Sequence, residues 1–572
     1  MPGFFITNIE SQDSFELNNY CQEKCIRDEI QFKNVTVKRN ILNAFTKDKI
    51  FFENNQYILL TDGVIFDTEK LLDQTKTRDI KDALLSIAEN EEKFFESING
   101  HCSGALYYKN EDKWVIFTNP LGDRAIFYYY NNGEYIIGSQ LNYVTDYMKL
   151  VGISRNVDRH GISCLMDFGY FIDNSTCIKN IKRLYPGEYL VINDSACITR
   201  QYYIAEFEEK AISLEDAIES LDTAFCRAVK RIADKNLEYG YKNLLDISGG
   251  LDSRIICYTM KRLGYNNSIM ITYSQSNSHE EKITKSISQK LDFELYHKIL
   301  DNGKCIKDID ELVFMNSGVS YYYGITGGKD FLEVLDNRIL GMEFTGVLGD
   351  IYDGSMLTEN GLSKPTIESD KYRASKLNSI DKKNSYSTYI NKFKKNDTFW
   401  LYTRGMLAGL STFLIRQNFI EPVTPFGDKD FLRCYLSIPW EMRVKDRVLF
   451  KWFLNKYPSA TQIRYAATGL KPINHSSKFS KVKYRLLLYI KKGWSLLQGK
   501  PLPNNMNPVK FWLKANEDLI PYIDNYFYTE MEACSLSQEI KSKLYSLYND
   551  NSDFNNKAVA LTVVAYSKLF IK

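Results

Sequence analysis

The stretch "LLDISGGLDSRIICYTMKRLG" (residues 244–264) constrains the fold of this 572-residue chain more than any other. "KNLLDI" is a short apolar run typical of a buried strand, and "SRIICYTMKRLG" has the apolar spacing of a helix that Gly264 would end. Between them lies Ser248-Gly249-Gly250. Glycines let main-chain amides approach an anion closely, and the start of a helix adds the positive end of its dipole. The stretch therefore predicts a strand, a turn and a helix that together bind phosphate groups.

The side chains of this turn also suit a nucleotide. Ser248 and Ser253 offer hydroxyl donors to phosphate oxygens. Asp252 would repel a phosphate on its own, and it makes sense as a ligand of Mg²⁺ that bridges to the phosphates. The chain has neither a G-x-x-x-x-G-K-[ST] loop nor a G-x-G-x-x-G turn. We predict that six residues of the turn bind the nucleotide: Ser248, Gly249, Gly250, Leu251, Asp252 and Ser253.

The elements that follow extend this unit. "NNSIMITYS" (266–274) is expected to be a second strand, and "FELYHKIL" (293–300) a third. Between them Ser278 and Glu281 form a capping box that opens a helix. Strands that alternate with helices in this way predict a parallel sheet covered on both faces.

The first 208 residues have a different pattern. Short alternating runs such as "YILLTDGVIF", "KWVIFTN" and "EYIIGS", separated by Asn, Gly and Asp turns, predict an antiparallel β-sandwich with a few helices. Ser213 and Asp216 then mark the start of a helix, and the pattern after about residue 398 is mainly helical. Because a chain of this length exceeds one hydrophobic core, we predict an α/β protein with domains at 1–208 and 209–572.

Composition excludes several classes of function. Lys and Arg number 73 against 71 Asp and Glu, so no overall field attracts nucleic acid. The eleven cysteines form no C-x-x-C pair and the five histidines no H-E-x-x-H motif, which argues against a disulfide framework and a zinc hydrolase. Cys21 and Cys25 have the i, i+4 spacing that could put two thiols on one helix face, but without two more ligands nearby, ordinary buried or surface thiols are expected. Without a signal-peptide pattern or an apolar run of about 18 residues, a cytoplasmic protein with no transmembrane segment is expected.

One basic segment stands apart from the rest of the chain. Residues 471–500 carry eight Lys or Arg and no acid around an apolar stripe. The pattern fits a helix packed on the core with a solvated basic face. It also fits a surface that meets a membrane or an anionic partner, and both interpretations stay open.

Five collinear stretches resemble the asparagine synthetase family. "SGGLDS" (248–253) is similar to the pyrophosphate loop of its ATP-pyrophosphatase enzymes. The others match further motifs in order: "NPLGDRAIFYY" (119–129), "KRLYPGEYLVI" (182–192), "GVLGDIYDG" (346–354) and "PVTPFGDKDFLRCYLSIP" (422–439). The resemblance implies an Ntn-like, class II glutamine amidotransferase-like sandwich. It also implies an adenine nucleotide α-hydrolase-like second domain with a helical C-terminal part.

The resemblance also implies a reaction and its residues. Members of the family bind ATP and Mg²⁺, transfer AMP to a carboxylate and release pyrophosphate, and a nitrogen nucleophile then displaces AMP. Asp252 and Asp350 match the two magnesium-binding acids. Gly346 and the main chain at Met270 and Ile271 are expected to contact ATP. A basic residue is expected at the reacting phosphorus, and the candidates are Lys445, Lys451 and, preferred among them, Lys471.

The N-terminal domain departs from the family pattern. Members with glutaminase activity begin Met-Cys-Gly, whereas this chain begins "MPG", and proline lacks the thiol that a thioester requires. The N-G-E segment of the glutamine pocket reads "DGV" at 62–64. We therefore expect a degenerate domain without glutaminase activity, similar to the Cys-less β-lactam synthetases and lasso-peptide cyclases. Cys21 or Cys25 acting as a replacement thiol is the alternative.

The synthetase motif also departs from the family. The pattern S-G-E-G-x-D-E reads "TGVLGDI" (345–351), so Val347 stands where the family has a Glu that helps to handle the ammonia proton. Valine cannot accept a proton, and another group must do so if an amine attacks. Glu343 is the candidate base, and a tyrosine of "SYYYG" (320–324) is the alternative.

The leading expectation is an ATP- and Mg²⁺-dependent, AMP-forming ligase that makes an amide bond without a glutaminase of its own. Its substrate is a carboxylate on a small molecule, peptide or glycan. The nitrogen comes from ammonia, from an amine of the substrate or from a partner, and a homodimer stays open. Two alternatives remain: an asparagine synthetase that uses free ammonia, and a non-catalytic homologue that binds ATP.

Overall fold

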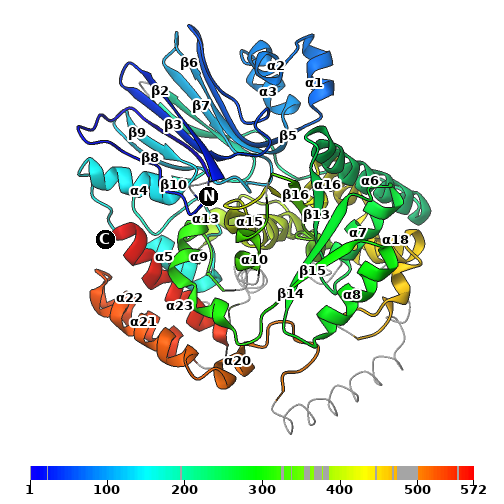
Figure 1. Ribbon diagram of the computed structural model, residues 1–572. Helices are drawn as coiled ribbons and strands as arrows, with labels where there is room; N and C mark the ends of the chain where they lie inside the picture. Colours follow the sequence, from blue (N-terminus) through cyan, green and yellow to red (C-terminus); the bar gives the residue numbers. More distant parts are fainter. Residues whose placement is uncertain are drawn as a thin grey trace.

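The computed structural model describes most of the chain. The described residues are 2–21, 24–193, 196–323, 328–336, 338–352, 361–365, 377, 386–444, 447–466, 469–472, 500–550 and 553–572. They form a mixed α/β protein with antiparallel sheets in the N-terminal part and a parallel sheet later in the chain (Figure 1). Over the described ranges, we find no helix with the length and apolar character that crossing a membrane requires.

Two six-stranded antiparallel sheets make up the N-terminal part. The first has the order β10-β8-β9-β1-β3-β2 and the second β12-β11-β7-β6-β5-β4. The strands of the first sheet are β1 (Gly3–Thr7), β2 (Cys25–Phe32), β3 (Val35–Leu42), β8 (Phe127–Asn131), β9 (Glu134–Gly138) and β10 (Ile181–Arg183). Those of the second are β4 (Phe51–Glu53), β5 (Tyr57–Phe66), β6 (Asn99–Tyr108), β7 (Lys113–Phe117), β11 (Glu188–Asn193) and β12 (Ala196–Gln201).

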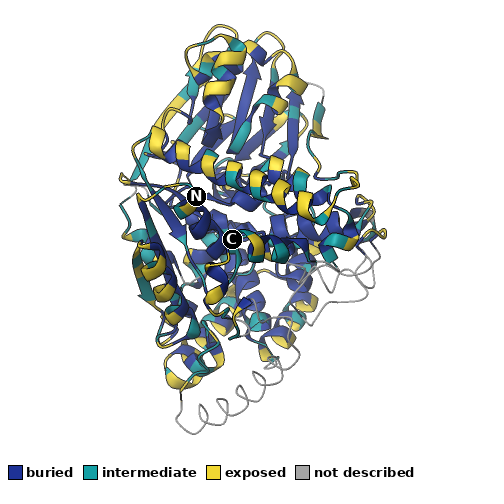
Figure 2. Ribbon diagram, turned by 90° about the vertical axis from the view of Figure 1, so that its right-hand side faces the viewer, coloured by how far each residue is buried: buried dark blue, intermediate teal, exposed yellow. Residues whose placement is uncertain are grey.

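The period of two along these strands builds the layers. Phe4 and Ile6 of β1 lie in the core between the sheets, whereas Phe5 belongs to the cluster on the outer face of the first sheet. Helices α1 (Thr68–Thr75), α2 (Ile80–Ile87) and α3 (Glu91–Ser97) lie beside the second sheet, and α4 (Leu141–Leu150) and α5 (Arg159–Phe168) lie beside the first (Figure 1). Figure 2 shows mostly buried strands and helices whose outward faces are exposed. The predicted sandwich is confirmed, with helices on both outer faces.

The i, i+4 spacing of Cys21 and Cys25 does not correspond to a shared helix face, and both are free, partly buried thiols. Cys25 begins strand β2, which pairs antiparallel with β3, and the Cys25 thiol donates to the carbonyl oxygen of Cys21. Pairing with the neighbouring strand decides the conformation here, because the segment continues as a regular ladder as far as Phe32.

The parallel sheet has the order β15-β14-β13-β16-β17. Its strands are β13 (Lys242–Asp246), β14 (Ser268–Ser274), β15 (Glu294–Ile299), β16 (Leu340–Phe344) and β17 (Pro422–Val423). The predicted β-α-β-α-β run is confirmed, with α7 (Asp252–Arg262) after β13 and α8 (His279–Leu291) after β14. Figure 1 shows these helices on one side of the sheet, and α10 (Lys329–Glu333) and α15 (Ser411–Arg416) on the other.

The predicted helix starts at Ser213 and Ser278 and the predicted helix end at Gly264 are confirmed. The Ser213 hydroxyl accepts a hydrogen bond from Asp216 N at 3.1 Å at the start of α6 (Leu214–Glu238). Ser278 accepts from Glu281 N at 3.2 Å at the start of α8, and Gly264, with φ of +84°, follows the end of α7. Short polar side chains at a helix start satisfy amides that the helix cannot, so these boundaries are readable from sequence.

The remaining chain is mainly helical, as predicted. Its helices are α9 (Ile309–Met315), α11 (Gly349–Tyr352), α13 (Ser387–Ile390), α14 (Asn396–Trp400), α16 (Lys429–Leu436), α17 (Trp440–Val444), α18 (Val448–Lys456), α20 (Val509–Ala515), α21 (Leu519–Ala533), α22 (Gln538–Asn549) and α23 (Phe554–Tyr566), with a π-helical segment at Leu401–Gly409. One buried cluster joins residues from both predicted domains. The boundary between residues 208 and 209 stays a prediction.

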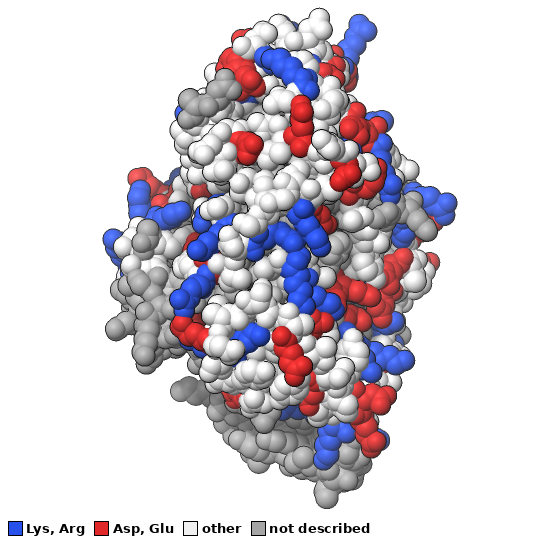
Figure 3. All heavy atoms as spheres, turned by 90° about the vertical axis from the view of Figure 1, so that its left-hand side faces the viewer, with Lys and Arg blue, Asp and Glu red and all other residues white. Residues whose placement is uncertain are grey.

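The surface carries charges of both signs. On the face shown in Figure 3, basic and acidic side chains are interspersed, in keeping with 73 basic and 71 acidic residues. Most of the basic segment noted in the sequence, residues 473–499, lies outside the described residues. Its two interpretations therefore stay predictions.

Candidate functional site

Because of the strand order, the loops that follow β13 and β16 lie at the centre of the parallel sheet. The chain runs from β13 to β14 and β15 on one side, whereas β16 and β17 lie on the other side of β13. The loops that leave the carboxyl ends of β13 and β16 therefore diverge, and such a switch point is where open parallel sheets bind ligands. The loop after β13 is "SGGLDS", and the loop after β16 is "TGVLGD".

The turn after β13 is held in shape by its own two serines. The Ser253 hydroxyl accepts a hydrogen bond from Ser248 N at 2.9 Å and lies 2.9 Å from the Ser248 hydroxyl. Gly250 N donates to the Ser248 hydroxyl at 3.2 Å. Helix α7 begins directly afterwards at Asp252. The predicted strand–turn–helix unit is thus present, with Ser248, Gly250 and Ser253 in one hydrogen-bonded turn.

Gly249 is enclosed by Glu280 and Ala466. Its amide donates to Glu280 Oε1 at 2.5 Å, and its carbonyl oxygen accepts from Ala466 N at 3.1 Å. A Cβ atom at position 249 would lie 2.6 Å from Ala466 Cβ and 2.7 Å from Glu280 Oε2, so only glycine fits here. Burial raises the pKa of Glu280, whose carboxyl group lies next to the turn that is predicted to bind phosphates.

The acidic loop after β16 lies directly against this turn. A Cβ atom on Gly346 would lie 2.8 Å from Ser253 N, and one on Gly349 would lie 2.3 Å from Asp252 Cγ. Asp350 follows in the first turn of α11. The structure therefore brings together the segments of the two predicted magnesium ligands, Asp252 and Asp350.

These two acids fit magnesium in their donor chemistry. Magnesium in nucleotide sites is held by one or two carboxylates, and phosphate oxygens and water complete the set. Among the described residues, no group of three or more His, Cys, Asp or Glu side chains forms a metal site by itself. A pair of acids beside a turn that is predicted to bind phosphates is what a nucleotide-bridged magnesium requires.

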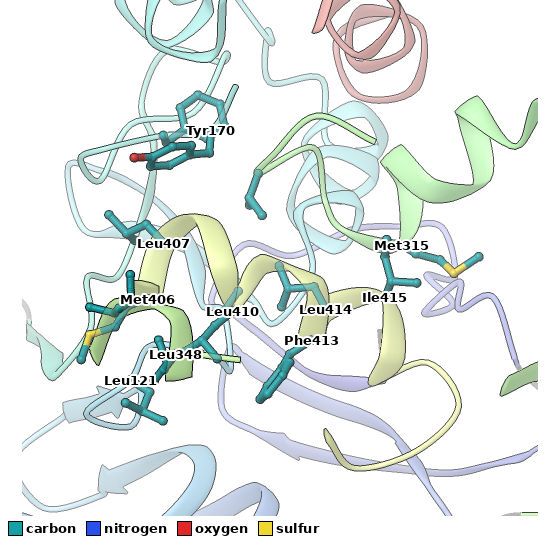
Figure 4. Packing of buried hydrophobic residues seen from close by; sticks show 14 of the residues in the cluster. Leu121, Tyr170, Met315, Leu348, Met406, Leu407, Leu410, Phe413, Leu414 and Ile415 are labelled. Carbon is teal, nitrogen blue, oxygen red and sulfur yellow. The ribbon is translucent and has the colours of Figure 1, made fainter. Parts of the chain in front are cut away.

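The acidic loop is anchored by Leu348. This residue has φ of +78°, a conformation that a branched side chain seldom adopts and that costs about 1–3 kcal/mol. Its side chain is buried beside Met406 and Leu410, with Leu121 of the sandwich nearby (Figure 4). Packing therefore fixes the strained turn that precedes Asp350.

A buried polar cluster lies at the same sheet edge. Arg416 of α15 donates to Asp246 Oδ2 at 2.9 Å, to the Tyr273 hydroxyl at 2.6 Å and to Glu343 Oε1. Glu343, the predicted base, is fully buried, and its second oxygen, Oε2, has no hydrogen-bond partner among the described residues. Burial raises the pKa of Glu343 to about 7. A carboxyl group with this pKa is able to accept a proton near neutral pH.

Sequence reasoning missed three members of this site: Asp246, Glu280 and Arg416. Asp246 follows the buried pair Leu244 and Leu245, and Arg416 follows the buried apolar run "FLI" (413–415). A lone charge in a stretch that must be buried indicates a buried partner, so these two carried a signal. Glu280 lay within a charged helix start and carried none.

Lys471, the preferred basic residue, lies shortly after the segment that contacts the turn. Its side chain is exposed and donates to Gln462 Oε1 at 3.3 Å. Lys451 is on α18, and Lys445 lies outside the described residues. Among the alternative tyrosines, the Tyr322 hydroxyl donates to the carbonyl oxygen of Ile306. The choice between these groups stays a prediction.

Met270 and Ile271 lie inside β14, an interior strand of the parallel sheet. They pair with Leu245 and Asp246 on one side and with β15 on the other, and the carbonyl oxygen of Ile271 accepts from Ile247 N at 2.9 Å. Adenine recognition by their main chain stays a prediction.

The segment that resembles the glutamine pocket is filled by buried charges. Arg124 Nη1 donates to Asp62 Oδ2 at 3.0 Å, and Arg124 also pairs with Glu421, which precedes β17. Lys49 Nζ lies 2.7 Å from Glu421 Oε1. The four side chains are only 1–3 % exposed. Asp62 thus serves a salt-bridge network between the sandwich and the parallel sheet.

The two cysteines considered as replacement nucleophiles are poorly suited to that role. Burial raises the pKa of Cys21 to about 11, and it also raises the pKa of Cys25. The thiolate is the reactive form of cysteine, and a raised pKa leaves little of it at neutral pH.

A family model and a curated relative each match part of this chain. A family model described as a glutamine amidotransferase domain matches residues 44–203. Asparagine synthetase [glutamine-hydrolyzing] 3 of Bacillus subtilis (strain 168) is 22% identical over 319 residues, 54% of this chain and 48% of that protein. The chain thus matches about half the length of this curated relative.

Two solved structures also match part of the chain. The glutamine phosphoribosylpyrophosphate amidotransferase of B. subtilis, complexed with ADP and GMP, is 12% identical, covers 47% of this chain and 77% of its own, and has a TM-score of 0.22. A structure described as the allosteric regulatory enzyme of purine biosynthesis is 11% identical, covers 46% and 66%, and has a TM-score of 0.21. Superpositions with such scores are no basis for a common fold.

Proposed function

We propose that this protein is an amidotransferase-type ligase that uses ATP and Mg²⁺ to join a carboxylate to a nitrogen nucleophile. One observation carries the proposal: the glycine turn after β13 and the acidic loop after β16 touch at the switch point of a parallel sheet. The similarity to an asparagine synthetase and to a glutamine amidotransferase domain supports the same class.

The reaction is an adenylation followed by amide formation, with ATP as a substrate. An oxygen of the carboxylate attacks the α-phosphorus, and the bond from that phosphorus to pyrophosphate breaks. The amine nitrogen then bonds to the acyl carbon, the bond to AMP breaks, and the amine proton passes to a base. Adenylation is needed because a carboxylate by itself has a poor leaving group.

The chain's own residues have distinct tasks in this proposal. The turn 248–253 and Gly346 bind the phosphates of ATP, and Lys471 contacts the reacting phosphorus. Asp252 and Asp350 would hold magnesium, which when bound neutralises charge on the departing pyrophosphate. Glu343 is the base for the amine proton, since it is buried and its pKa is raised to about 7.

The nitrogen does not come from glutamine hydrolysed by this chain. Asp62 stands in the segment that resembles a glutamine pocket, and its carboxylate is paired with Arg124 inside a buried network. Ammonia, an amine of the substrate or an amine supplied by a partner is the nucleophile instead. The substrate is a carboxylate on a small molecule, peptide or glycan.

Two other functions have some support. The name of the curated relative favours asparagine synthesis, so aspartate with free ammonia belongs among the substrates tested. Val347 and Ile351 pack with the apolar core instead of offering polar atoms, which favours a non-catalytic ATP-binding homologue. The contact between the Asp252 and Asp350 segments argues for turnover.

Pyrophosphate release tests the proposal. Mg²⁺-dependent release from ATP would be measured with a panel of carboxylates that includes aspartate, for the wild type, Asp252→Ala and Asp350→Ala. Release that requires one acid and both aspartates supports the ligase and identifies the substrate class. Tight ATP binding without release from any acid of a broad panel would favour the non-catalytic homologue.

A further inference from the structure

Arg254 is a buried cation immediately after the phosphate turn. It lies in the first turns of α7 and has no exposed surface. Its Nη1 donates to the carbonyl oxygens of Ala460 at 3.3 Å and Ile463 at 3.0 Å. Its Nη2 donates to the carbonyl oxygens of Gly249 at 3.2 Å and Arg464 at 2.7 Å. One guanidinium group thus joins the turn to a segment more than 200 residues away.

Only arginine suits this position. A buried cation is costly unless several hydrogen bonds compensate it, and the planar guanidinium group presents donors in a fixed fork that four carbonyl oxygens can share. Burial lowers the pKa of Arg254 to about 10, so the group keeps its charge at neutral pH. A lysine would keep the charge but would not reach both segments with the same geometry.

The segment held by Arg254 leads directly to Lys471. Ala466 N donates to the carbonyl oxygen of Gly249 at 3.1 Å, which adds a second contact with the turn. Tyr465 N donates to the carbonyl oxygen of Leu470 at 2.8 Å, so the chain returns to the same place just before Lys471. The side chain of Lys471 in turn donates to Gln462, two residues from Ala460.

Glu280 completes the arrangement from the other side. It accepts from the amide of Gly249, whereas Arg254 and Ala466 donate to the carbonyl oxygen of the same residue. Both main-chain groups of Gly249 are therefore fixed, one of them by a buried cation. The position of the turn depends on the segment 460–466, and the position of that segment depends on the turn.

We propose that Arg254 is a positioning residue for the phosphate site. By bonding to Gly249 and to the segment 460–464 at once, it holds Lys471 beside the turn, where a lysine ammonium group contacts pyrophosphate or the phosphates of a nucleotide. This inference rests on the proposed function, because Lys471 matters only if the turn binds phosphates. Arg254 itself does not touch the ligand.

A double-mutant cycle on binding of magnesium pyrophosphate tests this. Titration calorimetry on the full chain would compare the wild type, Arg254→Lys, Lys471→Ala and the double variant. We expect each single change to weaken binding about tenfold, which is the loss of one charged contact worth about 1.4 kcal/mol. Because Arg254 acts through Lys471, the double variant should bind as the single variants do.

The opposite result overturns the inference. If Arg254→Lys weakens binding by the same factor with and without Lys471, the losses multiply to about a hundredfold. Arg254 would then only shape the turn. Arg262→Lys is the matched control, since it lies on the same helix and pairs with Asp222 at 3.0 Å. Its affinity for pyrophosphate should equal that of the wild type.

Gln462→Ala provides a second arm that spares the core, in case Arg254→Lys does not fold. It removes the contact of Lys471 at the protein surface. It should weaken binding in the wild type and have no effect in Lys471→Ala, and equal effects in both backgrounds would contradict the inference. If the wild type binds neither magnesium pyrophosphate nor MgATP, both proposals fall. If it binds and Lys471→Ala binds equally well, only the role of Arg254 fails.

Discussion

Two regions of this molecule gather buried charges, and they do so in opposite ways. At the segment that resembles a glutamine pocket, Asp62, Arg124, Glu421 and Lys49 form ion pairs with one another and are 1–3 % exposed. At the edge of the parallel sheet, a glycine turn and an acidic loop meet in a contact that only glycines allow. The first arrangement joins two parts of the fold, and the second brings together groups that are predicted to bind a ligand.

This difference separates a structural network of ion pairs from a candidate ligand site in a chain whose sequence identity to known proteins is low. Buried ion pairs with balanced charge add little net stability over an apolar core, yet removing one partner is costly. Glycines at 346 and 349 have a different purpose, since they bring the acidic loop close to Asp252 and Ser253, and Gly249 leaves room for Ala466 and Glu280 beside the turn. Close main-chain approach beside acids is a feature of phosphate and metal sites.

The largest effect should follow from removing a predicted magnesium ligand. Asp252→Asn should lower Mg²⁺-dependent pyrophosphate release by at least about a hundredfold, because the metal neutralises charge that develops on the leaving group. Asp234→Asn, at an exposed site paired with Lys230, should leave release unchanged. Equal rates of pyrophosphate release in Asp252→Asn and the wild type would mean that the loops after β13 and β16 take no part in the reaction.

Breaking the ion-pair network around Arg124 should lower the stability of the fold more than the rate of pyrophosphate release. Arg124→Met leaves the carboxylates of Asp62 and Glu421 without this partner and should lower the free energy of unfolding by about 3–5 kcal/mol. Lys230→Met, which breaks an exposed pair with Asp234, should cost less than about 1 kcal/mol. Urea denaturation measures both. If Arg124→Met is as stable as the wild type and hydrolyses glutamine, this segment is a glutamine site instead of a structural charge network, which would contradict the account.

A smaller effect is expected from the titration of Glu343. Its pKa in the folded state is raised to about 7, whereas in the unfolded chain it lies in the ordinary carboxyl range. Between these values the folded state holds a proton that the unfolded state has lost, so this group lowers stability as the pH rises from about 5 to about 8.

Denaturation midpoints across that range check the prediction. Glu343→Gln removes the titration and should show a flatter pH dependence than the wild type. Glu281→Gln is the control, since the pKa of Glu281 is lowered and its titration lies below this range. Parallel curves for the wild type and Glu343→Gln would contradict a raised pKa.

The smallest effect concerns Glu280. Glu280→Gln keeps an oxygen that accepts from the amide of Gly249 but removes a negative charge beside the predicted phosphate site. We expect binding of magnesium pyrophosphate to tighten by about threefold, a modest Coulomb effect for a partly screened charge. Glu281→Gln, in the same turn of α8 and paired with Lys285, should change nothing. Weaker binding in Glu280→Gln would mean that its charge shapes the turn.

Local rules predicted much of the fold from sequence. The strand, turn and helix around 248–253, the caps at Ser213 and Ser278, and the alternating strands of the sandwich follow from short-range patterns. The strand that begins at Cys25 is set by pairing with β3, which the spacing of two cysteines does not reveal. Tertiary pairing overrides local spacing in such cases.

The candidate site was only partly predictable for the same reason. Asp252 and Asp350 carry motif signals that are local in sequence. Arg254, Glu280 and Arg416 acquire their roles from contacts between segments that lie 31 to 210 residues apart along the chain. Such contacts depend on the order of strands in the sheet, which no local pattern encodes.

Hydrogen–deuterium exchange of the full chain, with MgATP or with glutamine added, tests the central claim most directly. The account predicts that MgATP slows exchange at residues 247–254 and 346–351, and that glutamine leaves residues 58–66 and 119–127 unchanged. Protection of the sandwich segments by glutamine, together with no protection of the two sheet-edge loops by MgATP, would contradict it.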